Sequence, residues 1–166
     1  MINFFSNNIF SSNPTWSIGI IIVLFGIVAT HRLLIYRDKK NIFNNAAKEF
    51  SEIIYHELCE IYPIPVNWPE NIEGYLGNKF PVLQSAVNNF ARYLTEIEKT
   101  EFLNAWAIYR VGEDGSEIDQ QDYWQYTPHR STSIVYGEKT EYDNTKTYKE
   151  NFKHNVDNIL KYAKQT

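Results

Sequence analysis

Apolar residues form one unbroken run near the N-terminus and helical stripes in the rest of the chain. The run extends from Trp16 to Thr30, and no Asp, Glu, Lys or Arg precedes Arg32. A charged side chain at the centre of a membrane helix costs about 2.5–3.5 kcal/mol on insertion scales, so an uncharged run rich in Ile, Val, Leu and Phe favours hydrocarbon. About 20 helical residues cross a bilayer. The pattern predicts a transmembrane helix over residues 15–36, after a short tail of residues 1–14.

Charge asymmetry predicts how this helix is oriented. Arg32, Arg37, Lys39 and Lys40 follow the apolar run, and no basic residue precedes it. By the positive-inside rule, the N-terminus is outside and the C-terminal part is cytoplasmic. Arg37, Lys39 and Lys40 would then contact the lipid bilayer at its cytoplasmic surface. Two alternatives are a cleaved signal peptide, which would carry its charge before the run and a small-residue cleavage site, and a buried soluble helix.

An amphipathic stripe covers residues 42–61, with apolar side chains every three or four positions and no Gly or Pro. We expect the transmembrane helix to continue into this stripe, with a break near residues 38–41 as the alternative. Pro63 and Pro65 then end the helix, because each lacks an N–H and disfavours helical geometry in the preceding residue. The stripe comprises Ile42, Phe43, Ala46, Ala47, Phe50, Ile53, Ile54, Leu58 and Ile61.

Further helices are predicted downstream. A short helix covers residues 69–77 and ends at Gly77, and a longer helix starts at Phe80-Pro81. Thr95 and Glu98 have the spacing of a capping box, which marks a new helix over residues 96–110. The side chains expected inside are Val82, Leu83, Ala86, Val87, Phe90, Ala91 and Leu94 in one helix, and Ile97, Phe102, Leu103, Trp106 and Tyr109 in the next.

A final helix is predicted over residues 144–164, with Tyr148, Phe152, Val156, Leu160 and Ala163 on one face. Residues 116–142 lack a clear period, and a short pair of strands is one interpretation of them. Residues 37–166 are therefore expected to form an all-α cytoplasmic domain of four or five helices behind the membrane anchor, with a β pair confined to residues 116–142.

Composition narrows the classes of partner. The net charge is −4, which argues against a general nucleic-acid binder. The chain has one cysteine, Cys59, so it forms no intramolecular disulfide, as is usual in a reducing cytoplasm. Gly19 and Gly26 share a helix face that would allow copies to associate as a homo-oligomer, although glycine is common in membrane helices without that role.

Several segments resemble a group of small bacterial membrane proteins, frequent in gammaproteobacteria, that carry no assigned activity. Members often have Cys after the tyrosine equivalent to Tyr109, where this chain has Arg110. The resemblance implies a single helix in a bacterial inner (plasma) membrane and a helical cytoplasmic domain, and it implies no chemistry. The resembling tracts are Arg37-Asp-Lys-Lys40, Phe43-Asn-Asn-Ala-Ala-Lys-Glu-Phe50, Phe80-Pro81, Ala86-Val87, Phe90, Tyr93-Leu94, Phe102-Leu-Asn-Ala-Trp-Ala-Ile-Tyr109 and Asn158-Ile-Leu-Lys-Tyr-Ala-Lys164.

Two groups of residues on the first amphipathic helix have the side chains needed for chemistry. Glu52, His56 and Glu60 are four residues apart, so their imidazole and carboxylates could bind a transition metal. The stripe lies mostly opposite the apolar face, which favours a solvated polar surface. Cys59 is near His56, as a thiol near its base would be, but no orienting group or oxyanion site accompanies them. A small buried or half-buried cysteine is the expected interpretation.

Two more candidates lie near the C-terminal third. His129-Arg130-Ser131-Thr132-Ser133 has side chains that hold anions, although a surface loop is the simpler interpretation. Trp106, Tyr109, Trp124 and Tyr126 could form a stacking surface for a ligand, although helix-periodic aromatics usually lie in a core.

These patterns favour a membrane-tethered, non-enzymatic protein-interaction module with an unidentified protein partner. We expect no catalytic, cofactor-binding or metal-binding residue, no cofactor and no nucleic-acid partner. The alternative is a membrane-anchored sensor or effector that binds a small ligand or a metal through its helical domain.

Overall fold

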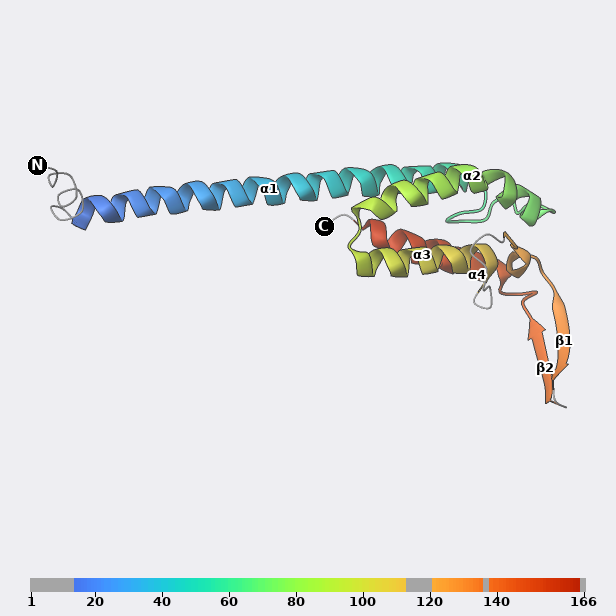
Figure 1. The fold of residues 1–166 in the computed structure, drawn as a ribbon. Coiled ribbons are helices and arrows are strands. Elements are labelled where there is room, and N and C mark those ends of the chain that lie inside the picture. The colour runs from blue at the N-terminus through green and yellow to red at the C-terminus, as the bar shows by residue number, and fades with distance from the viewer. Residues whose placement is uncertain (1–13, 113–120, 136–137, 165–166) are drawn as a thin grey trace, which may run out of the picture. The chain divides into compact units, whose positions relative to one another are not determined.

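The computed structural model describes residues 14–112, 121–135 and 138–164, and all of their side chains except those of residues 14–18, 20, 21, 133–135, 138 and 140. These residues are mostly helical, with one small sheet (Figure 1). The α-helices are α1 (Pro14–Glu57), α2 (Ile72–Phe90), α3 (Glu96–Val111) and α4 (Tyr148–Leu160). The strands are β1 (Arg130–Val135) and β2 (Glu138–Asp143), and the short 3-10 helices are η1 (Ala91–Tyr93), η2 (Trp124–Tyr126) and η3 (Lys161–Ala163).

The chain divides into two compact units, Met1–Ile42 and Phe43–Thr166. In the first unit, large apolar side chains of α1 are exposed, among them Phe25 at 76% and Leu33 at 61%. Every buried side chain described belongs to the second unit, between Ala47 and Ala163. The hydrophobic core of this protein is therefore the core of residues 43–166.

The transmembrane helix predicted over residues 15–36 is a wrong prediction. Within the described parts of the chain, no helix combines the length and the apolar character that a membrane crossing requires. In its described part, α1 includes the charged residues Arg32, Arg37, Asp38, Lys39 and Lys40, and charged side chains are costly in hydrocarbon.

The predictions that depended on this helix are corrected with it. They are the all-α fold with a membrane anchor and the inner-membrane location with the C-terminal domain in the cytoplasm. The contact of Arg37, Lys39 and Lys40 with a lipid bilayer stays an untested prediction. Pro14 begins α1, and the other residues of the predicted tail lie outside the described residues. The structure has a single helix from Pro14 to Glu57, without a break near residues 38–41.

The second half of α1 packs antiparallel against α2. Near the start of α2, Lys79 Nζ lies 3.0 Å from Glu57 Oε2. Near its end, the rings of Phe50 and Phe90 stack with centroids 4.8 Å apart, and the ring of Phe102 on α3 meets both edge-on. Such aromatic pairs stabilise a core beyond the area they bury. Three helices thus converge on one aromatic cluster.

The structure has one helix, α2, where the sequence predicted two. Pro81 lies inside α2, and Gly77 does not end it. Proline in a helix interior removes one hydrogen bond and crowds the carbonyl four residues earlier, which belongs here to Gly77. The compensation is a continuous buried stripe on both sides of Pro81, which only an unbroken helix can present to the core. The stripe is Ile72, Leu76, Leu83, Ala86, Val87 and Phe90.

Helix α3 begins where the sequence predicted. The Thr95 hydroxyl accepts from the Glu98 N–H, and the Glu98 carboxylate accepts from the Thr95 N–H at 3.0 Å, so the capping box is confirmed. The Thr95 hydroxyl also donates to the Glu98 carboxylate at 2.7 Å, and this hydrogen bond, followed by the one from the Thr95 N–H, lowers the pKa of Glu98. Phe102, Trp106 and Tyr109 are buried as predicted, but Ile97 and Leu103 are exposed, because they lie off the face that α2 and α4 cover.

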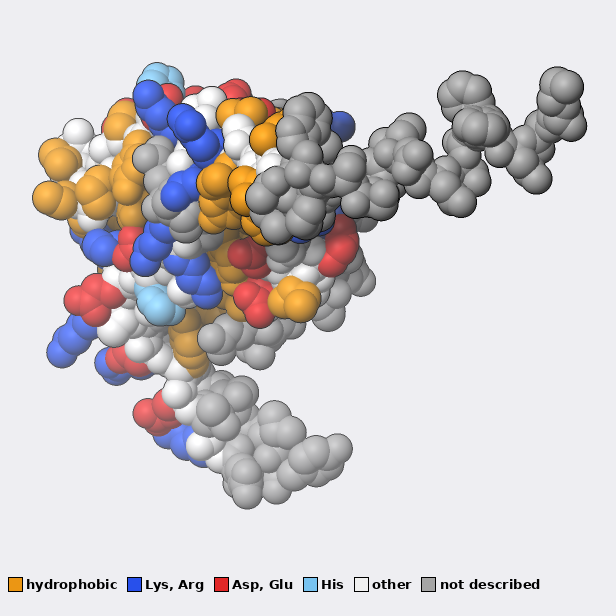
Figure 2. All heavy atoms as spheres, turned by 90° about the vertical axis from the view of Figure 1, so that its left-hand side faces the viewer, with side chains coloured by type: hydrophobic (Ala, Val, Ile, Leu, Met, Phe, Trp, Pro, Cys, Tyr) orange, Lys and Arg blue, Asp and Glu red, His pale blue; other side chains and the backbone are white. Residues whose placement is uncertain are grey.

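The predicted strand pair is confirmed as the antiparallel hairpin β1–β2, which runs from the pair Arg130 and Asp143 to the pair Val135 and Glu138. It connects η2 to α4, and α4 lies beside α3 (Figure 1). On the face drawn in Figure 2, basic and acidic side chains both occur among hydrophobic ones. The hairpin contributes one described residue, Tyr142, to the lining of the candidate site.

Candidate functional site

Two adjoining cavities lie along α3 and α4. The first, of about 300 Å³, lies at the hairpin end of the helices, and the second, of about 370 Å³, extends toward η3. Ile108 and Asn155 line both of them. We call the pair the amide groove. Its described lining is Ile108, Gly112, Trp124, Gln125, Tyr142, Asn151, His154 and Asn155 in the first cavity, and Glu101, Asn104, Ala105, Asn158, Lys161 and Tyr162 in the second, which also includes Ile108 and Asn155.

The floor of the amide groove is fixed by two buried amides, Gln125 and Asn155, each 8% exposed. Gln125 Nε2 donates to the carbonyl of Ile108 at 2.8 Å and to that of Tyr109 at 3.2 Å. Asn155 Nδ2 donates to the Tyr126 hydroxyl at 3.0 Å. Because the amide nitrogens are held by the protein, both side chains are fixed in position, as a preorganised binding surface requires.

Tyr126 anchors this floor from below. It is fully buried, and its hydroxyl donates to the Tyr109 carbonyl at 2.9 Å while accepting from Asn155. Burial raises the pKa of Tyr126 well above its ordinary value of 10.0, so the hydroxyl stays protonated and keeps donating. Its ring packs edge-on against Phe152 of α4 with centroids 5.1 Å apart. The groove floor is thereby part of the aromatic core.

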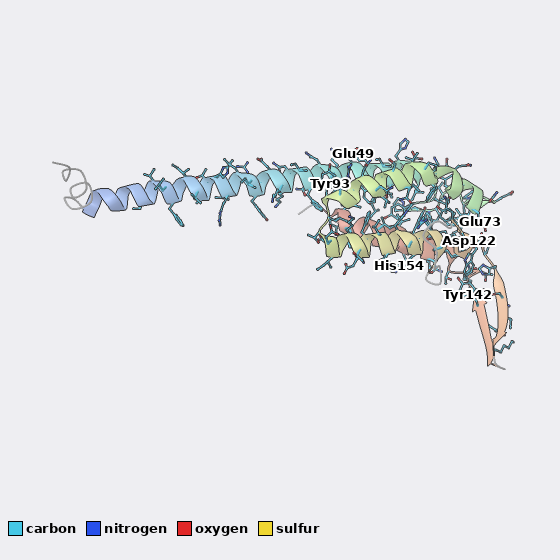
Figure 3. All side chains as sticks on the ribbon, in the orientation of Figure 1. Glu49, Glu73, Tyr93, Asp122, Tyr142 and His154 are labelled. Carbon is cyan, nitrogen blue, oxygen red and sulfur yellow. The ribbon has the colours of Figure 1, made fainter. Side chains whose placement is uncertain are left out.

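Three rings close the hairpin end of the groove. The Trp124 ring centroid lies 4.8 Å from that of His129 and 5.5 Å from that of Tyr142, and His129 stacks on Tyr142 at 5.0 Å. Trp124 and His129 are half-buried, and Tyr142 is 37% exposed. Figure 3 labels Tyr142 on β2 and His154 on α4, which line the same cavity. The rings form a partly exposed aromatic wall.

Asn144 holds this wall in place. Its side chain is 1% exposed; Nδ2 donates to the carbonyls of Gln125 and Thr127, both at 3.0 Å, and Oδ1 accepts from the His129 N–H at 2.7 Å. At the base of the hairpin, Arg130 pairs with Asp143. Hydrogen bonds from Thr145, followed by that from Arg130, lower the pKa of Asp143 to about 2. A buried amide thus fixes the hairpin to η2, and a surface ion pair joins the two strands at its base.

Opposite charges occupy the other end of the groove. The Tyr162 hydroxyl donates to Glu101 Oε2 at 3.4 Å, and Lys161 Nζ lies 4.9 Å from the centroid of the Tyr162 ring. Glu101 is on α3, whereas Lys161 and Tyr162 are on η3. A ligand that lies along the groove would meet an aromatic wall, then amides, then one acidic and one basic side chain.

The stripe of Glu52, His56 and Glu60 is a solvated surface, as the sequence analysis favoured. Glu52, His56 and Glu60 are exposed, and α1 ends at Glu57, so Glu60 leaves the helix face. Glu52 pairs with Lys48 at 3.7 Å, and His56 Nδ1 lies 3.3 Å from Glu57 Oε1. Among the described residues there is no group of three His, Cys, Asp or Glu side chains that could hold a metal.

Cys59 was expected to be buried or half-buried, and this prediction is wrong. The thiol is exposed, in the turn that follows α1. The helix ends two residues earlier, at Glu57, so its apolar stripe no longer sets which way Cys59 faces. Leu58 and Ile61 on either side of the turn are buried instead.

The aromatic candidates divide between the core and the groove. Trp106, Tyr109 and Tyr126 are buried, as expected for core residues, whereas Trp124 lines the groove. Residues 129–133 were expected to be a surface loop, but all of them except His129 belong to strand β1. The sequence analysis did not identify the groove asparagines, because they match no known binding motif. They are Asn104, Asn151, Asn155 and Asn158. The available signal was Asn151, Asn155 and Asn158 at helical spacing on one face.

We compared the chain with known proteins, and it matches no family model, no curated protein and no solved structure.

Proposed function

We propose that this protein is a protein-interaction module whose amide groove binds an extended segment of a partner polypeptide. The observation that supports this proposal is the lining of the groove, in which five side-chain amides follow an aromatic wall. A side-chain amide offers both a donor and an acceptor, as a peptide unit does. A row of amides therefore suits the alternating N–H and C=O groups of an extended backbone.

The length of the groove supports a chain-like ligand over a compact one. The two cavities together extend from Tyr142 on β2 to Lys161 on η3, and only Ile108 and Asn155 belong to both. The aromatic wall at one end gives an apolar or aromatic side chain of the ligand a surface to stack on. Glu101 and Lys161 at the other end favour a segment that carries a charge there.

Peptide selection with a groove-filling variant tests this proposal. Asn151 lines the first cavity and is half-buried on α4, so Asn151→Trp should fill that cavity. Glu150 is the exposed neighbour on the same helix and does not line the groove, which makes Glu150→Trp the matched control. A random peptide library on phage is selected against the full chain and against each variant, and circular dichroism verifies that both variants fold.

Peptides that bind the wild-type chain and Glu150→Trp, and bind Asn151→Trp at least tenfold more weakly, would support the proposal. Enrichment that is equal on Asn151→Trp, or no enrichment at all, would contradict it. A parallel screen against immobilised saccharides covers the alternative of a small polar ligand, since sugars also stack on aromatic rings and bind amides. If a saccharide binds the wild-type chain but not Asn151→Trp, and no peptide binds, the groove would be assigned to a small polar ligand instead of a polypeptide.

A further inference from the structure

A smaller hollow lies between α1 and α2, in the part of α1 that belongs to the second unit. Its volume is about 220 Å³, and its floor is the stacked pair Phe50 and Phe90. Ala46 and Ala86 also line it, and their short side chains leave the space above the rings open. The hollow therefore offers an apolar floor that is reachable from the surface.

The residues around this hollow repeat with the spacing of a helix-packing seam. Lining residues are three and four positions apart both on α1 and along α2 and η1, which are the alternating steps of a heptad pattern. Val82 continues the α2 row four residues before Ala86. The seam is partly apolar and exposed, since Val82 is 46% and Tyr93 is 48% exposed. We call this surface the outer seam. It comprises Ala46, Glu49 and Ile53 of α1, and Val82, Ala86, Asn89 and Tyr93 of α2 and η1.

Two opposite charges flank the hollow without pairing to each other. Glu49 on α1 and Arg92 on η1 both line it, and both are exposed. Neither forms a salt bridge with any described residue. Figure 3 labels Glu49 on α1 and Tyr93 on η1, which follows the end of α2. Arg92 precedes Tyr93 in η1. An apolar hollow between one acidic and one basic side chain is complementary to itself.

We propose that the outer seam binds a second copy of this chain. A two-fold axis through the midpoint between Glu49 and Arg92 exchanges their positions, so each Glu49 meets the Arg92 of the other copy. The exposed ring of Tyr93 then inserts into the hollow of the partner, above Phe50 and Phe90. Ala46 and Ala86 allow close approach, and the resulting pair of α1–α2 hairpins packs as four helices.

Charge reversal and fluorescence energy transfer test the dimer. Cys59 is the one cysteine of the chain and is exposed, so the full chain can be labelled there with donor or acceptor dyes. Donor-labelled and acceptor-labelled wild-type chains are mixed, and each single variant, Glu49→Arg or Arg92→Glu, is mixed with itself in the same way. In a fourth sample, donor-labelled Glu49→Arg is mixed with acceptor-labelled Arg92→Glu. Glu70→Arg reverses an exposed charge in the loop before α2, away from the seam, and serves as the control.

We expect transfer in the wild type and in Glu70→Arg, and at least tenfold weaker association for each single reversal, because it places two like charges opposite each other twice in one dimer. The mixture of the two reversed chains should associate again. No transfer in the wild type, unchanged transfer in the single reversals, or no recovery in the mixture would each overturn the proposal. The dimer does not depend on the amide groove, so the peptide selection and this experiment succeed or fail separately.

Discussion

Two buried tyrosines that lie three residues apart should respond in opposite ways to the loss of a hydroxyl. Tyr126 is fully buried, and its hydroxyl bridges the Tyr109 carbonyl and Asn155 Nδ2. Tyr123 is 2% exposed, and its hydroxyl has no hydrogen-bond partner among the described residues. Tyr126→Phe therefore breaks two hydrogen bonds, whereas Tyr123→Phe removes a polar atom that is buried without one.

The magnitude follows from what each change leaves behind. In Tyr126→Phe, Asn155 Nδ2 becomes an unsatisfied buried donor, which costs about 1–3 kcal/mol, whereas the Tyr109 carbonyl keeps its hydrogen bond from Gln125. We expect a loss of about 2 kcal/mol in the free energy of unfolding. At roughly 3–5 °C per kcal/mol for a domain of this size, Tm falls by about 6–10 °C. Tyr123→Phe should be neutral or should raise the stability by about 1 kcal/mol.

Urea unfolding of the full-length variants, followed by tryptophan fluorescence, measures both effects. An unchanged slope with denaturant, together with a shifted midpoint, would show that the stability has changed and not the compactness of either state. Equal stabilities of the two variants within about 0.5 kcal/mol would refute the reasoning, since the two changes differ only in the hydrogen bonds of the hydroxyl. Tyr126→Phe should also weaken peptide binding, because it frees the side chain of Asn155 in the groove floor.

Three further changes have expected outcomes. Thr95→Ala removes the acceptor for the Glu98 N–H and should lower the unfolding free energy by about 1 kcal/mol in urea titration. The hydrogen bond from Lys79 lowers the pKa of Glu57 below its ordinary value of 4.5. This pair should contribute about 0.5–1 kcal/mol to the unfolding free energy above pH 4.5, and the contribution should disappear as the pH falls through the lowered pKa. Glu57→Gln should therefore flatten the curve of stability against pH in this range. Leu83→Ala, at a site with no exposed surface, should cost about 2–5 kcal/mol by calorimetry or urea titration.

Local rules in the sequence predicted those elements whose signals are themselves local. The capping box at Thr95 and Glu98 fixed the start of α3, because both of its hydrogen bonds lie within four residues. Pro81 was misleading for the same reason, since a local rule predicts a break that the long buried stripe of α2 overrides. Cys59 was misplaced because the orientation of a turn depends on what the neighbouring Leu58 and Ile61 bury. Periodicity alone could not show where the first helix would end.

The amide groove could not be predicted from the sequence, because its residues come from several elements that lie apart in the chain. Gln125 comes from η2, Asn155 from α4 and Tyr142 from the hairpin, and their proximity depends on the buried side chain of Asn144, which joins η2 to the start of the hairpin. A buried asparagine that makes three hydrogen bonds to backbone groups is costly to leave unsatisfied, so it specifies one arrangement of these segments. The same argument makes Asn144 the residue on which the aromatic wall depends. In this protein the buried amides fix the geometry of the candidate site, and the aromatic core supports them from below.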